Sequence, residues 1–161
     1  MDEQQIRNLY EAFGLAMYQA QCIERQLAIL LVSLQEKSPQ NRTTLELEAL
    51  YTRAFQRTLG QLLDLVRREA SIPAEMETRL TEALSTRNHL AHNYFWDRAG
   101  EVQTVTGRQF MIQELREIAT RFDQLDEELT ALMQGWTEQF GITQAVLESA
   151  MQRLKEDSMN R

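Results

Sequence analysis

The feature that most constrains this chain is a long apolar stripe near its N-terminus. Apolar side chains recur there in steps of three and four, the spacing that gathers them on one face of an α-helix. They are Ile6, Leu9, Tyr10, Phe13, Met17, Ala20, Ile23, Leu27, Leu30, Leu31 and Leu34. The pattern predicts a helix over residues 3–36, about 45–50 Å long at 1.5 Å per residue. A helix of this length typically scaffolds a bundle or an oligomer interface. Gln21 and Glu24 interrupt the stripe, and we expect both to face solvent.

Shorter segments with the same spacing follow, separated by glycine and proline. They predict helices over residues 44–57, 58–68, 74–99 and 108–136, and a final helix over about 143–156. Thr43 with Glu46 resembles a capping box, Thr58 is placed to cap the next helix, and Gly100 is a natural stop. Residues 101–107 form a connection that we expect to resemble a brief hairpin. The fold expected is all-α, an up-and-down bundle of four to five helices in one domain over residues 1–161.

Composition supports a globular protein and argues against one class of function. The chain has 161 residues, 43% hydrophobic and 25% charged, which is enough to bury a core. Its net charge of −7 argues against a protein that coats nucleic acid through a broad basic surface, since that needs clustered Lys and Arg. The single cysteine, Cys22, lies in a helical apolar pattern and is interpreted as a small buried hydrophobe.

The sequence also predicts a location. The first residues are acidic and polar, unlike the entry of a signal peptide, and no run of about 18 apolar residues is present. We therefore expect no membrane partner and a cytoplasmic protein.

Residues 85–96 differ from the rest of the chain. This segment contains both histidines of the protein, together with an arginine, two asparagines, a tyrosine and a tryptophan. On a helix Asn88 and His92 are four apart and stack, while Arg87 lies beside them and Tyr94 at the edge of the same polar stripe. Ala91, between them, leaves room for a phosphate-sized ligand or a second helix.

These residue types suit the cleavage of RNA by its own 2′-hydroxyl. A histidine exchanges a proton near neutral pH, so His92 would act as acid or base. An arginine offers a fixed fork of donors to phosphate, so Arg87 would stabilise the charge of the phosphorane. No metal or other cofactor is expected. A two-fold dimer would bring two histidines and two arginines into one cleft.

The pattern Arg87-Asn88-x-x-x-His92-x-Tyr94 resembles the R-x4-H-x-Y motif of HEPN domains, notably of HepT-type toxins. The resemblance covers about eight residues closely and the helical layout loosely. It implies a small all-α bundle that acts as a homodimer. The implied function is that of a metal-independent endoribonuclease, a toxin or a defence effector.

The resemblance also implies a role for each matching residue. Arg87 and His92 would be catalytic at an interface between protomers, and Asn88 would support them. Tyr94 matches the position that partner nucleotidyltransferase antitoxins modify in some systems, which implies an antitoxin or other protein partner. Three features depart from the family pattern: the extra C-terminal helix, the acidic net charge of the chain and the longer connection after the motif.

Other interpretations of the same residues stay open. Arg87 would pair with Glu82 or Asp97 if its role were structural, and His89 with His92 would be two ligands of a metal. The aromatic run 94–96 would stack bases or lie in a core. The alternative function is a non-catalytic HEPN-like bundle that binds a partner protein or a nucleotide, and the simplest is a structural helical dimer.

Overall fold

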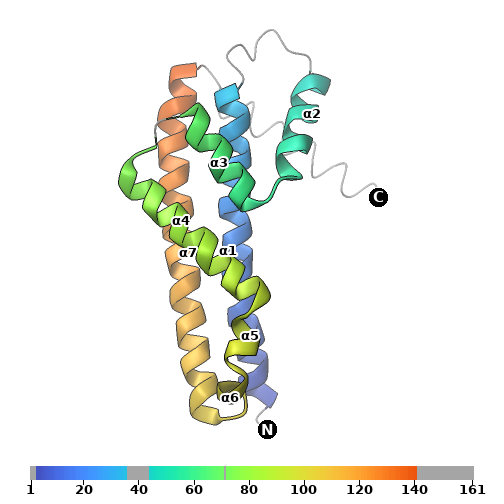
Figure 1. Ribbon diagram of the computed structural model, residues 1–161, viewed down its shortest axis with the longest axis vertical. Helices are drawn as coiled ribbons and strands as arrows, with labels where there is room; N and C mark the ends of the chain where they lie inside the picture. The colour runs from blue at the N-terminus through green and yellow to red at the C-terminus, as the bar shows by residue number, and fades with distance from the viewer. Residues whose placement is uncertain (1–2, 36–43, 71, 141–161) are drawn as a thin grey trace.

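The computed structural model describes residues 3–35, 44–70 and 72–140, and every regular element in these ranges is a helix (Figure 1). The all-α prediction is therefore confirmed, whereas the helix expected over 143–156 and the cap expected at Thr43 lie outside the described residues. The helices are α1 (Glu3–Gln35), α2 (Thr44–Phe55), α3 (Leu59–Glu69), α4 (Ala74–His92), α5 (Tyr94–Asp97), α6 (Ala99–Val102) and α7 (Val105–Phe140).

The two long helices, α1 and α7, run side by side and parallel along the length of the molecule (Figure 1). Hydrogen bonds between them keep a nearly constant register. Gln19 Nε2 donates to Asp123 Oδ1 at 2.9 Å, and Gln26 Nε2 donates to Thr130 Oγ1 at 3.0 Å. Each pair is separated by 104 residues, so the first and last described helices are direct neighbours.

The core lies mainly between α1, α7 and α3. The predicted stripe of α1 is buried along most of its length, and burial of each large aliphatic side chain contributes about 1.5–3 kcal/mol. Fully buried side chains include Ile23, Leu27 and Leu31 of α1, Leu62, Leu63 and Val66 of α3, and Met111 and Leu115 of α7.

Helix α4 crosses diagonally in front of α1 and α7 and carries the candidate motif (Figure 1). Its buried residues are Leu80, Ala83 and Leu90, and Arg79 forms an ion pair with Glu128 of α7. Helix α4 ends at His92, because Asn93 leaves helical geometry with φ −128° and ψ −22°. The prediction of one helix through residue 99 was therefore right as far as His92 and wrong beyond it.

Local sequence signals predicted the start of α3 correctly but failed before α7. Thr58 forms the predicted cap of α3, as a capping box in which its hydroxyl and the Gln61 side chain each bind the other's backbone N–H. The expected stop at Gly100 was wrong, since that residue lies within α6. The hairpin expected over 101–107 is also wrong, because α6 and α7 occupy most of that stretch.

Among the described helices, none combines the length and the hydropathy that a membrane-spanning segment requires.

Candidate functional site

Arg87 lies on α4 and turns toward α1 rather than toward open solvent. Its Nη2 lies 3.6 Å from Glu24 Oε2, and the two side chains are 25% and 21% exposed. Its Nη1 donates a hydrogen bond to Asn88 Oδ1 at 3.1 Å. Neither Glu82 nor Asp97, the partners considered from the sequence, binds it. The expectation that Glu24 faces solvent was wrong, since Glu24 is the residue of α1 that holds this arginine.

His92 is the last residue of α4, and its side chain is exposed. It makes no side-chain hydrogen bond or ion pair with the described part of the chain. Asn88, one turn earlier, is also exposed and contacts Arg87. The stripe predicted for Arg87, Asn88 and His92 is thus present on the helix, with the arginine half-buried at one edge and the histidine open to solvent.

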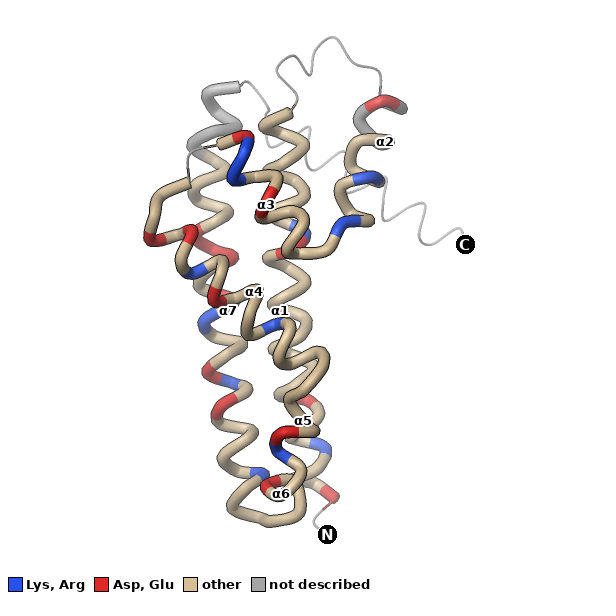
Figure 2. Tube along the Cα trace, in the orientation of Figure 1, with Lys and Arg blue, Asp and Glu red and all other residues tan. Residues whose placement is uncertain are grey.

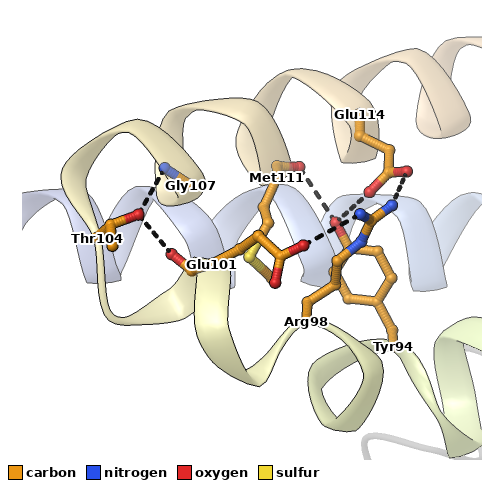
Figure 3. A network of polar contacts seen from close by, with 7 residues as sticks. All are labelled: Tyr94, Arg98, Glu101, Thr104, Gly107, Met111 and Glu114. Atoms are coloured by element: carbon orange, nitrogen blue, oxygen red, sulfur yellow. Dashed lines mark hydrogen bonds and ion pairs between the residues drawn. The ribbon is translucent and has the colours of Figure 1, made fainter.

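Tyr94 does not lie at the edge of the exposed stripe, because its side chain is 1% exposed (Figure 3). Its ring contacts Phe13 of α1, and its hydroxyl donates to Glu114 Oε2 at 2.9 Å, with Met111 O at 3.4 Å. Burial, and the acceptor Glu114, raise the pKa of Tyr94 well above its ordinary value. This residue therefore anchors the end of the motif in the core and presents no hydroxyl to a modifying partner.

Glu114 is shared between Tyr94 and Arg98, which completes a network that joins α5, α6 and α7 (Figure 3). Arg98 Nη2 donates to Glu114 Oε1 at 2.6 Å, and Arg98 Nη1 lies 3.5 Å from Glu101 Oε1. All three charged side chains are partly buried, so these pairs are stronger than exposed ones. The network fixes the chain that leaves α4 against the start of α7.

The second histidine has a different environment from the first. His89 Nδ1 lies 3.6 Å from Asp97 Oδ2, and its ring meets the edge of Tyr94. In the aromatic run, Phe95 packs against Tyr10 and Phe13 of α1, whereas Trp96 is 85% exposed. The run is therefore divided, with two rings packed against the helices and one ring in solvent.

Charge around the motif is mixed. Figure 2 shows acidic and basic positions interspersed along the described helices rather than gathered on one element. The buried Arg108 donates to Gln5 Oε1 at 3.0 Å and to the carbonyl of Val102 at 2.8 Å, which ties α7 to α1 and α6. Arg98 and Arg108 therefore join helices of the fold to one another. Arg87 is the arginine of α4 that belongs to the candidate site.

Sequence reasoning missed Glu24 and Glu114, the two carboxylates that position the motif segment. Glu24 is 63 positions before Arg87, and Glu114 is 20 positions after Tyr94. Glu24 interrupts the apolar stripe of α1, and that interruption is the signal that a partner existed.

In comparisons with known proteins, no family model, no curated protein and no solved structure matches this chain.

Proposed function

We propose that this chain is a metal-independent endoribonuclease of the toxin or defence type, active as a homodimer, in which Arg87 and His92 contribute to a composite site. The observation that carries the proposal is the contrast between these two side chains. His92 is exposed without a side-chain partner in the described residues, and Arg87 is held nearby on the same helix by Glu24. An exposed imidazole is available to a substrate, and an oriented guanidinium is preorganised for phosphate.

In the proposed reaction, His92 of one protomer takes the proton of the 2′-hydroxyl, and that oxygen attacks the adjacent phosphorus. The partner's His92 gives a proton to the departing 5′-oxygen. Arg87 stabilises the negative charge that builds up on the phosphorane oxygens. The products are a 2′,3′-cyclic phosphate and a 5′-hydroxyl. Asn88 keeps the guanidinium oriented through its side-chain oxygen.

The experiment is incubation of single-stranded RNA in EDTA with the wild-type chain, His92→Ala and Arg87→Ala. We expect His92→Ala to reduce cleavage by at least about 100-fold, the usual contribution of a general acid–base group. We expect Arg87→Ala to reduce cleavage by about 100-fold to 1000-fold, the usual cost of removing one group that stabilises transition-state charge. His89→Ala is the matched control, since His89 lies on the same helix but pairs with Asp97. Cleavage by all four proteins at one rate, or by none of them, would overturn the proposal for the RNAs tested.

A second function is supported by the pairing of Arg87. Because Glu24 offsets its charge, the arginine also fits a structural role in a non-catalytic bundle that binds a partner protein or a nucleotide. For such a bundle we expect the nucleotide or partner protein to bind the His92→Ala variant as well as the wild-type chain, measured by calorimetry without RNA. We also expect the wild-type chain to cleave none of the RNAs tested.

A further inference from the structure

The exposed face of α1 carries two tyrosines placed symmetrically about a glycine. Tyr10 and Tyr18 are each four residues from Gly14, so the three lie along one side of the helix. The tyrosines are 59% and 60% exposed. Leu15 beside them is also exposed. Neighbouring exposed apolar side chains of this kind mark interaction surfaces more often than isolated ones.

Gly14 has no packing role among the residues that the structure describes. A Cβ added at this position would meet nothing within 4 Å, so an alanine would fit and would favour the helix. Glycine in the middle of a long helix is unfavourable unless something needs its bare backbone. A second helix that approaches closely at this point would need it.

We propose that this face of α1 is where a second copy of the chain docks, with the two-fold axis at Gly14 and the two α1 helices antiparallel. The proposal rests on the proposed function, since it names the partner that completes the Arg87 and His92 site.

The sequence of α1 is complementary to itself under this symmetry. Two-fold rotation about residue 14 places each residue opposite the one equally far on the other side. Tyr10 then faces the partner's Tyr18, which pairs two rings that are each more than half exposed in the single chain. Glu3 and Arg25 are each eleven positions from Gly14 and are both exposed, so their opposite charges face each other across the axis. The Arg25 guanidinium lies 4.5 Å from the centroid of the Phe55 ring, so α2 flanks this end of the face.

This face borders the motif. Tyr10 meets the edge of Phe95 of α5 at 5.8 Å between ring centroids, and Glu24, further along α1, holds Arg87. A copy docked about Gly14 therefore lies beside the segment that contains His92. A histidine from each subunit is what the proposed reaction needs.

The test is the oligomeric state of the full chain by sedimentation velocity over a range of concentrations. We expect a wild-type dimer, and we expect Gly14→Glu and Gly14→Lys, each measured alone, to weaken association at least about tenfold through like charges at the axis. An equimolar mixture of the two variants should restore a dimer, because residue 14 of one copy then meets the opposite charge. Val105→Glu and Val105→Lys, at a similarly exposed position of α7, should leave association unchanged.

A monomeric wild-type chain would overturn both this surface and the homodimeric ribonuclease, whereas the other outcomes would overturn this surface alone. A wild-type chain that is monomeric throughout, a dimer that both charged variants retain, or a mixture that stays monomeric would each reject the α1 surface. Circular dichroism should show unchanged helix content in every variant, since position 14 is open. Sedimentation needs no RNA, so a chain that dimerises through α1 but cleaves nothing would keep this surface and reject the proposed activity.

Discussion

Gly107 allows a sharp test of the packing described here. This glycine lies in the first turn of α7, where α6 passes directly over it. A Cβ added there would lie 2.6 Å from Glu101 Cα and 2.7 Å from its carbonyl carbon, and closer still to its carbonyl oxygen. These atoms belong to the backbone of Glu101, so the rotation of a side chain cannot relieve the overlap. Gly107→Ala therefore requires α6 to move relative to α7.

Two effects of opposite sign decide the magnitude. Replacing a helical glycine by alanine gains roughly 0.5–1 kcal/mol in chain entropy, and overpacking against rigid neighbours costs roughly 1–3 kcal/mol. We expect the cost to prevail and Gly107→Ala to lose about 1–2 kcal/mol. For a chain of this size that corresponds to a fall in Tm of about 2–8 °C.

The measurement is urea unfolding followed by circular dichroism at a single fixed protein concentration. Gly60→Ala is the matched control, because a Cβ at Gly60 would meet the Leu84 side-chain methyls at 3.6 and 3.8 Å, which is ordinary contact. We expect this control to be neutral or slightly stabilising. If Gly107→Ala proves as stable as Gly60→Ala, the close approach of α6 to α7 is not present in solution.

Three further substitutions test other contacts by the same unfolding assay. Tyr94→Phe should cost about 1.5–3 kcal/mol, the usual contribution of a hydrogen bond to a charged acceptor. The raised pKa of Tyr94 means that its proton is held more tightly in the folded state, so the stability of the wild-type chain should fall as pH rises above about 10. The Phe variant should lose less stability over the same pH range. Equal losses of stability in the two proteins would contradict this. Asp126 has one buried carboxylate oxygen that has no hydrogen-bond partner among the described residues. Its burial, and to a lesser extent the charges of Asp123 and Glu127, raise its pKa. Asp126→Asn should therefore stabilise the chain at pH 7, and this gain in stability should shrink as the pH is lowered. Thr58→Ala should cost about 1 kcal/mol by removing the cap of α3, and no change would show that the capping box contributes nothing.

Periodic patterns predicted most of the helices because burial follows helical spacing. The stripe of α1 predicted its bounds to within a residue, and Thr58 predicted its own cap because both partners of that cap are local. The break at Asn93 was missed. The buried Tyr94 lies directly after it, with its hydroxyl on Glu114, and no local rule places that contact.

In the candidate site too, the sequence predicted what depends on one helix and missed what depends on contacts between helices. The exposed stripe of Asn88 and His92 follows from spacing on one helix, and the sequence predicted it. The environments of Arg87 and Tyr94 depend on residues in other helices, Glu24 and Glu114, and a single sequence does not show which helices are neighbours. The tyrosine was therefore placed at the edge of the stripe, whereas tertiary packing buries it.

The parallel pairing of α1 with α7 also bears on how the chain reaches its fold. Contacts such as Gln19 with Asp123 close a loop of about a hundred residues, and such long closures slow folding relative to bundles of sequential hairpins. Of the described helices, α1 is synthesised first and its neighbour α7 last. Its apolar face toward α7 stays uncovered in the nascent chain until α7 has been made, which makes this helix the segment most exposed to misassociation or to chaperones.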